Sequence, residues 1–170
     1  MGKRAPQFER RALDAYATPF EAVPPLIPFL DGFTTYAEPC CGEGRLVEHL
    51  AQLKPGLQCI WKSDIRDGID ALSIETVPAQ LIITNPPWER GELHPLIEHL
   101  MGLRPTWLLF DADWMHTKQA ALLLVKCERI VSVGRLRWIP DSANTGKDNV
   151  AWYLFDRHHR GPTRFHGRVP

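Results

Sequence analysis

The chain is organised around the eight residues Leu81-Ile82-Ile83-Thr84-Asn85-Pro86-Pro87-Trp88. Their first four residues are apolar or β-branched and predict a short buried strand, which the two prolines then prevent from continuing. The chain therefore leaves a sheet at Asn85 and displays an amide, rigid backbone carbonyls and an indole close together. An asparagine at a strand end normally serves a turn. Its place before two prolines and a tryptophan indicates a functional site instead.

Bulk properties indicate an ordinary globular domain. A chain of 170 residues with 44% hydrophobic and 24% charged side chains fits one domain with a real core. The formal net charge is zero, so no overall field draws the protein to nucleic acid, and any such binding needs a local basic patch.

Cysteine spacing and hydropathy bear on the compartment. Cys40, Cys41, Cys59 and Cys127 lack the paired spacing of a zinc site or a disulfide framework, which favours a reducing environment. No apolar run of signal-peptide length follows the basic start, and no segment has the length of a membrane span. We therefore expect a cytoplasmic protein with no metal site and no membrane contact.

A glycine-rich turn lies between a predicted strand at residues 34–37 and a predicted helix at residues 45–53. The turn reads Glu38-Pro39-Cys40-Cys41-Gly42-Glu43-Gly44. Glycines let the backbone approach a ligand closely, and the N-terminus of the helix offers N–H groups to an anion. A Gly-x-Gly turn alone is weak evidence, but strand, turn and helix in succession are typical of the first unit of a nucleotide-binding α/β sheet.

A second strand is predicted at residues 58–62, with Asp64 just beyond its end. Such sheets bind ribose hydroxyls with an acid at this position, although a turn or helix-cap aspartate is the alternative. Glu38 is expected to face the same crevice. Only twenty residues separate Asp64 from Asn85, which is too few for another full strand and helix, so the third sheet element should be trimmed or absent.

The remaining segments complete an α/β pattern. Thr18 is suited to cap a short helix with Pro19 at its first position and Glu21 completing a capping box. Further helices are predicted at residues 92–103 and after Asp111, and a strand at residues 106–110. Residues 129–138 and 149–155 predict an antiparallel hairpin around a long polar loop. The predicted organisation is a basic arm at 1–16, one domain at 17–156 and a basic tail at 157–170 with four arginines and three histidines.

These motifs together resemble the N6-adenine DNA methyltransferases of the gamma arrangement, which use S-adenosylmethionine (SAM). Thr18-Pro19 resembles the amino-terminal SAM motif, residues 38–44 resemble the glycine-rich SAM loop, and residues 85–88 resemble the catalytic motif. The similarity covers roughly residues 16–156. Small phage and prophage members look closest, through Gly146 to Asn149 and Trp152-Tyr153. The resemblance implies a Rossmann-like class I fold, with a mostly parallel seven-stranded sheet and an antiparallel hairpin at one edge.

The resemblance also implies roles for individual residues. The catalytic residues would be Asn85, Pro86, Pro87 and Trp88, with Trp88 stacking on the base. The SAM-binding residues would be Thr18, Pro19, Glu38, Pro39, Cys40, Gly42, Gly44, Asp64, Ile65, Asp70 and Asn85. Asp67 and Asp70 are both candidates for the contact to the SAM adenine, and Cys41 is a further candidate for the pocket lining. Arg135, Arg137 and Lys147, with the basic tail, would contact the nucleic-acid backbone.

Alternatives keep the same motifs and change the target. Asn-Pro-Pro-aromatic also serves RNA adenine and protein glutamine methylation, and a non-catalytic module that binds SAM or nucleic acid would retain the fold. A stacking indole and a basic rim favour a nucleobase over glutamine. No segment is long enough for a separate recognition region, so we expect a short recognition sequence or none. The sequence carries no signal for an oligomeric state.

Overall fold

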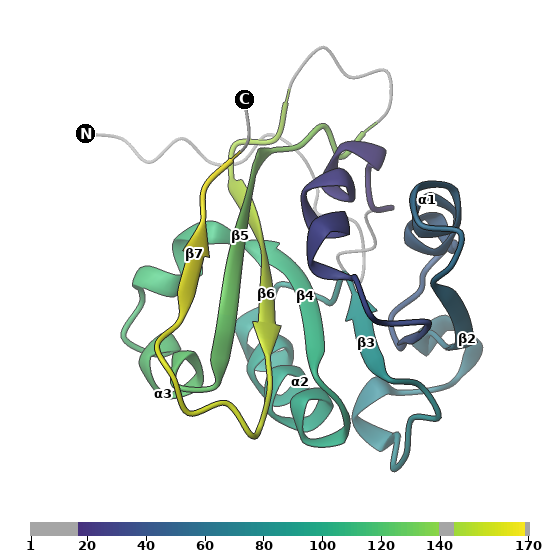
Figure 1. Ribbon diagram of the computed structural model, residues 1–170. Helices are drawn as coiled ribbons and strands as arrows, with labels where there is room; N and C mark the ends of the chain where they lie inside the picture. The colour runs from purple at the N-terminus through teal and green to yellow at the C-terminus, as the bar shows by residue number, and fades with distance from the viewer. Residues whose placement is uncertain (1–16, 140–144, 169–170) are drawn as a thin grey trace.

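The computed structural model of the chain describes residues 17–139 and 145–168 (Figure 1). The predicted basic arm at 1–16 and residues 140–144 of the predicted loop lie outside the described residues. The described segments form an α/β structure in which helices and turns cover both faces of one sheet.

The sheet has seven strands in the order β2-β1-β3-β4-β6-β5-β7. Pairing is parallel throughout except where β6 meets β4 and β5, so β6 runs opposite to the other six described strands. The carboxyl ends of those six strands therefore lie at one end of the sheet, which we call the carboxyl edge. The strands are β1 Thr35–Glu38, β2 Gln58–Lys62, β3 Leu81–Thr84, β4 Thr106–Asp111, β5 Cys127–Arg135, β6 Asn149–Phe155 and β7 Arg164–His166.

Helices and 3₁₀ turns divide the core into two layers, one on each face of the sheet. One layer packs η2, η3 and α1 against side chains such as Leu81 and Ile83. The other packs α2 and α3 against side chains such as Ile82. All four residues of β3 are buried, which explains its unbroken apolar run. The elements are η2 Phe20–Ala22, η3 Pro24–Phe29, α1 Arg45–Leu53, η4 Ile65–Asp67, η5 Ala71–Ser73, α2 Arg90–Leu103, η6 Ala112–His116 and α3 Ala120–Leu124.

The third sheet element is trimmed, as predicted. Between Asp64 and β3 the chain forms only the short turns η4 and η5, and it adds no strand there. Ala71 of η5, together with Ile74 and Val77, is buried in the same core layer as α2. Because no strand follows β2 outward, β2 is the last described strand on that side of the sheet.

Two predicted helices differ from the structure. Thr18 does not cap a helix: the residue before η2 is Pro19, and no side chain caps it. The prolines at 24, 25 and 28 lack an N–H donor, so the segment forms 3₁₀ turns in place of an α-helix. The helix predicted after Asp111 is divided into η6 and α3, because Thr117 adopts an extended conformation between them.

The antiparallel hairpin of β5 and β6 is confirmed, but it does not form the edge of the sheet. The strand predicted at 129–138 is observed at Cys127–Arg135, and β7 pairs in parallel with its outer side through Arg129↔Arg164 and Val131↔His166. β7 comes from the segment predicted to be a basic tail, where the only sequence signal was its charge.

Candidate active site

A cavity of about 290 Å³ lies at the carboxyl edge, beyond the ends of β1, β2 and β3. Open α/β sheets bind ligands in this crevice, because successive loops diverge there to opposite faces. Its volume is close to the lower end of the range for small-molecule sites, about 300–1,000 Å³. The lining residues are Ala17, Thr18, Glu38, Pro39, Cys40, Cys41, Gly42, Glu43, Arg45, Leu46, Asp64, Ile65, Arg66, Asp70, Ala71, Leu72, Asn85, Pro87, Glu92 and Leu96.

The glycine-rich turn is held against the end of β2. The Cys41 N–H donates to the Ser63 carbonyl at 3.0 Å, and the Ser63 N–H donates to the Glu38 carbonyl at 3.1 Å. Gly44 precedes α1 with a φ of +84°, a left-handed conformation that favours glycine. The turn thus brings its backbone and the first residues of α1, Arg45 and Leu46, to the cavity.

Asp64 joins this turn to the segment after β2. One carboxylate oxygen accepts from the Gly42 N–H at 2.7 Å, and the other accepts from the backbone N–H and Nε of Arg66, both at 3.0 Å. Burial raises the pKa of Asp64, but the hydrogen bonds from Arg66 and Gly42 outweigh it and leave the pKa below its usual value. Asp64 is therefore an ionised acceptor that lines the cavity and also caps η4.

Glu38 is a buried carboxyl group that the described residues do not fully satisfy. Its residue is 1% exposed, and Oε2 has no hydrogen-bond partner within the described part of the chain. Burial raises the pKa of Glu38 to about 8, with Lys62 opposing the shift and Asp64 adding to it. A ligand that brings a hydrogen-bond donor to this wall of the cavity would satisfy the oxygen.

Asn85 is oriented by two side chains from distant parts of the sequence. Its Nδ2 donates to Thr18 Oγ1 at 3.3 Å, and its Oδ1 accepts from Trp88 Nε1 at 3.3 Å. Trp88 Nε1 also lies 3.2 Å from the Leu109 carbonyl at the end of β4. These contacts place the amide oxygen on the Trp88 side and the amide nitrogen on the Thr18 side.

Trp88 is half-buried beside the cavity and packs against both core layers. Its ring meets Trp138 edge-on, with centroids 5.3 Å apart and an interplanar angle of 83°. Trp138 follows β5, so the long segment between β5 and β6 reaches the neighbourhood of Asn85. Sequence reasoning did not single out Trp138, since no local pattern links it to Trp88.

Most predicted SAM-binding residues line the cavity, and four residues of the predicted SAM-binding and catalytic sets do not. Asp70 lines it and Asp67 does not; the Asp70 carboxylate accepts from the Leu72 N–H at 2.9 Å. The predicted residues in the lining are Thr18, Glu38, Pro39, Cys40, Gly42, Asp64, Ile65, Asp70, Asn85 and Pro87. Those outside it are Pro19, Gly44, Pro86 and Trp88.

Several lining residues were not predicted. Arg45 and Leu46 begin the helix after the glycine-rich turn, so their position could have indicated them. Arg66 lies so close to the turn that a Cβ at Gly42 would meet its Nη2 at 3.0 Å. Further residues, among them Leu72 of η5 and Glu92 and Leu96 of α2, depend on how η5 and α2 pack and carry no local signal.

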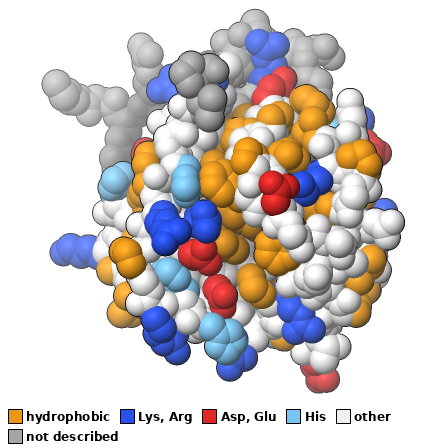
Figure 2. Space-filling model, in the orientation of Figure 1, with side chains coloured by type: hydrophobic (Ala, Val, Ile, Leu, Met, Phe, Trp, Pro, Cys, Tyr) orange, Lys and Arg blue, Asp and Glu red, His pale blue; other side chains and the backbone are white. Residues whose placement is uncertain are grey.

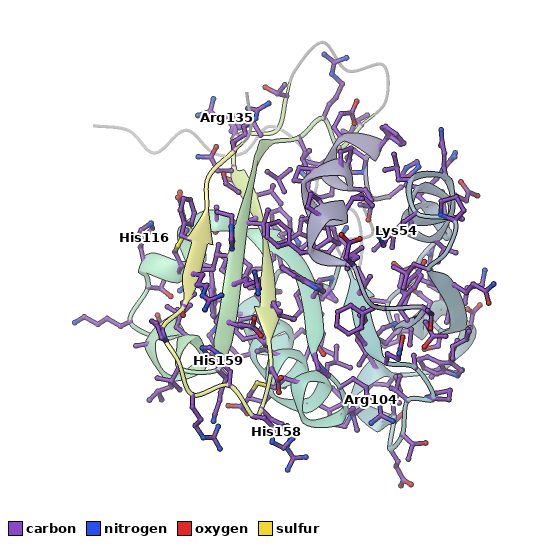
Figure 3. All side chains as sticks on the ribbon, in the orientation of Figure 1. Lys54, Arg104, His116, Arg135, His158 and His159 are labelled. Atoms are coloured by element: carbon purple, nitrogen blue, oxygen red, sulfur yellow. The ribbon has the colours of Figure 1, made fainter. Side chains whose placement is uncertain are left out.

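The three basic residues predicted to contact a backbone do not line the cavity. Arg135, Arg137 and Lys147 are exposed, at and beyond the end of β5 and in the segment before β6. Figure 3 places Arg135 at one end of the sheet and His158, His159 and Arg104 at the other. His158 and His159 of the predicted basic tail therefore lie at the opposite end of the sheet from Arg135.

A second cavity, of about 370 Å³, lies on the face that carries η3. Its lining includes Phe29, Trp107 and Leu154, with the ion pair between Glu128 and Arg129 at its rim. Hydrophobic side chains gather in the middle of this face with charged side chains around them (Figure 2). No predicted site residue contributes to it.

Known proteins match the chain in fold. No model of a known protein family matches it, and no curated protein matches it in sequence. A putative class I SAM-dependent methyltransferase from Listeria monocytogenes is similar with a TM-score of 0.56, at 12% identity, over 84% of this chain and 61% of its own. The chain has the fold of a class I methyltransferase.

A second neighbour is a chain of a type I R-M system, with a TM-score of 0.50 and 16% identity, over 95% of this chain and 46% of its own. The present chain therefore spans about three fifths of the length of the Listeria monocytogenes protein and just under half of the length of the R-M system chain. The neighbour from Listeria monocytogenes is described as SAM-dependent, which is the cofactor that the sequence predicts for this chain, and at 12% identity the likeness itself shows the fold. The Glu38 oxygen without a partner and the close backbone at Gly42 fit a ligand with amino and hydroxyl donors at this cavity.

Among the described residues, no helix has the length and hydropathy needed to cross a bilayer. Within the same residues, no three His, Cys, Asp or Glu side chains come together as metal ligands would.

Proposed function

We propose that the protein transfers a methyl group from SAM to the exocyclic N6 amine of adenine in DNA, at a short recognition sequence or none. The observation that carries this proposal is the position of Asn85. Its amide follows β3 directly, lines the cavity, is held between Thr18 and Trp88, and precedes two prolines that stiffen the backbone.

The amide explains how a poor nucleophile could react. The exocyclic amine of adenine has its lone pair delocalised into the ring. In this proposal the Asn85 Oδ1 and the Pro86 carbonyl each accept a hydrogen bond from the amine. Both hydrogen bonds strengthen as the nitrogen becomes tetrahedral. An amide oxygen has two acceptor positions, so Oδ1 can keep the Trp88 N–H while it accepts from the amine.

The cavity supplies complementary groups for the cofactor. Glu38 would pair with the ammonium group, Asp64 would accept from ribose hydroxyls, and Ile65 and Asp70 would lie beside the adenine. SAM supplies a methyl group on a sulfonium, which makes that carbon electrophilic. The contribution of the protein is orientation, because the reacting atoms must be held close and in line.

A nucleic-acid target is favoured by the indole and by the neighbouring basic side chains. Trp88 would stack on the base, which is worth about 1–3 kcal/mol in proteins that bind single strands. A base inside a duplex cannot reach this cavity, so the enzyme would flip it or act on single strands. The fold neighbour from a type I R-M system is compatible with DNA as the target.

The test is transfer of labelled methyl groups from SAM to duplex DNA, single-stranded DNA and total RNA, with nucleoside analysis of the products. N6-methyladenine in DNA is the expected result, and the ratio of duplex to single-strand activity reports base flipping. Label in RNA alone would show that the substrate is RNA and not DNA. Label in neither nucleic acid, with SAM still bound, would contradict the proposal and direct the search to glutamine in proteins or to a binding module.

The matched variant is Asn85→Ala. Loss of one transition-state hydrogen-bonding group typically lowers kcat by about 100- to 1,000-fold. SAM affinity, measured by calorimetry, should stay within severalfold of the original value, because Glu38 and Asp64 are untouched. An Asn85→Ala variant with full activity would refute the assigned role.

A further inference from the structure

The basic side chains after β5 lie at the same edge of the sheet as the candidate active site. β4 and β5 both run antiparallel to β6, and Val150 of β6 is aligned with Asp111 on one side and Gly134 on the other. The ends of β4 and β5 are therefore level with each other. Arg135, the last residue of β5, extends from this edge.

β7 brings one more arginine to this edge. β7 is parallel to β5 with Val131 aligned to His166, so the chain beyond His166 continues past Gly134. A Cβ at Gly134 would lie only 3.1 Å from Nη1 of Arg168. Gly134 has a φ of +92° next to an irregularity in the strand register, so the missing side chain makes room for the Arg168 guanidinium.

These side chains are continuous with Trp88. The Gly146 N–H donates to the Leu136 carbonyl at 2.8 Å, which places Lys147 beside the segment that holds Arg135 and Arg137. Trp138 follows directly and contacts Trp88. We call the four exposed side chains Arg135, Arg137, Lys147 and Arg168 the basic corner.

The other basic residues of the predicted tail lie elsewhere. Arg157 donates to the Gly102 carbonyl in the last turn of α2, at the opposite end of the sheet from the cavity. Arg160 follows in the turn between β6 and β7, where Nη1 bonds the carbonyls of residues 157 and 159. His158 and His159 lie at this end too, away from Arg135 (Figure 3).

Acidic side chains limit the path that a phosphate backbone could take. Asp111 and Asp113 follow β4, and Asp148 precedes β6 close enough to interact electrostatically with Asp111. Their negative charges repel phosphate over the end of β4 and the start of β6. The basic corner, over the ends of β5 and β7, is the adjoining route to Trp88.

We propose that Arg168 contacts the phosphate backbone of the nucleic-acid substrate and, with the rest of the basic corner, guides the strand to Trp88. This inference rests on the proposed function, since it takes nucleic acid as the substrate. Phosphate contacts of this kind position the strand and carry no sequence information, which agrees with weak specificity.

The experiment measures binding of a labelled oligonucleotide, duplex and single-stranded, across a series of KCl concentrations. Neutralising one phosphate contact should reduce the slope of log K against log salt by about 0.9 for duplex and about 0.7 for single strands. Arg168→Ala should show this reduction, and Arg168→Lys should restore most of the slope. Arg160→Ala, from the same segment at the opposite end, is the matched control and should keep the original slope.

Equal slopes for Arg168→Ala and the unaltered protein would overturn the inference, and so would an equal reduction in Arg160→Ala. Thermal unfolding of each variant establishes that it is folded. An unaltered protein that binds no nucleic acid would overturn both proposals. Binding with the expected Arg168 effect but no methyl transfer would contradict only the proposed reaction.

Discussion

At the scale of single residues, Trp88 carries the least expected arrangement. A phenylalanine or tyrosine ring could also stack on a base, but neither carries the N–H that the indole directs at Asn85 Oδ1 and the Leu109 carbonyl. Under the proposed function, Trp88 would have two separable functions, stacking on the target base and orientation of the Asn85 amide. The ring serves the first function and the N–H the second.

Trp88→Phe separates these functions because it keeps an aromatic face and removes the N–H. A net hydrogen bond is worth about 0.5–1.5 kcal/mol, so we expect kcat to fall several-fold with little change in KM. Steady-state kinetics with an oligonucleotide substrate measure the two parameters. An increase in KM with unchanged kcat would show that the N–H has no part in orienting Asn85.

Glu38 predicts a pH dependence of stability. In the unfolded chain its carboxyl titrates near 4.5, and in the folded protein its pKa is about 8, so the folded state binds the extra proton between these values. Its favourable contribution is complete below about pH 4.5 and is lost as pH rises through 8. Glu38→Gln removes this loss, and the variant should gain stability relative to the original protein as pH rises.

Denaturant unfolding at pH 5, 7 and 9, without SAM, checks this prediction. Each pKa unit corresponds to about 1.4 kcal/mol, so the relative gain should reach the order of a few kcal/mol at pH 9. Any difference in packing between the amide and the carboxyl group changes the stability equally at all three pH values and so does not alter the pH dependence. A stability difference that is the same at all three values would contradict the raised pKa.

At the scale of elements, long-range hydrogen bonds decide where the N-terminal segment lies. Trp152 of β6 is fully buried, and its Nε1 donates to the Ala22 carbonyl of η2 at 2.7 Å, across 130 residues of sequence. This contact holds η2 against the sheet, and Thr18, four residues earlier, reaches Asn85. The position of the Asn85 amide thus depends partly on β6.

Trp152→Phe should be destabilising, because it leaves the Ala22 carbonyl buried without that donor. The expected loss is about 1–3 kcal/mol, measured by urea unfolding. Leu154→Ala is a useful comparison on the same strand, since it removes packing from the same core layer and leaves the hydrogen bond to Ala22 in place. If the hydrogen bond also positions Thr18, Trp152→Phe should lower kcat at temperatures where the protein is fully folded, and Leu154→Ala should not.

At the scale of the whole molecule, positive and negative charges are equal in number but unevenly distributed over the surface. The formal net charge is zero and the sequence pI is about 7.1, yet basic side chains gather at the ends of β5 and β7 and acidic ones at the ends of β4 and β6. Binding of nucleic acid would then depend on orientation and salt, because no overall attraction supports it.

The same balance predicts low colloidal stability near neutral pH. Proteins without net charge at the working pH tend to associate, so light scattering at fixed protein concentration should be greatest near pH 7 and fall at pH 5.5 and 8.5. Added oligonucleotide should reduce scattering at pH 7 if the basic corner binds it. Scattering that does not change with pH would show that charge does not govern association.

The elements that could be read from sequence are those whose determinants are local. Helical spacing of leucines and a glycine turn predict α1 at its observed bounds, and turns on either side do the same for β2 and β6. Placing Glu38 and Asp64 at strand ends predicted that they face one crevice, since parallel strands share an edge, and both residues line the cavity. Twenty residues between Asp64 and Asn85 were too few for another full strand and helix, for reasons of length alone.

Contacts across long stretches of sequence required the folded chain. Thr18 meets Asn85 over 67 residues, Trp88 meets Trp138, and β7 pairs with β5 to bring Arg168 to Gly134. No local sequence pattern predicts such pairs, because each pair depends on how separate elements pack. The composition of the strands and turns therefore determined the architecture and the position of the cavity, while tertiary packing determined the orientation of the amide and the surface beside it.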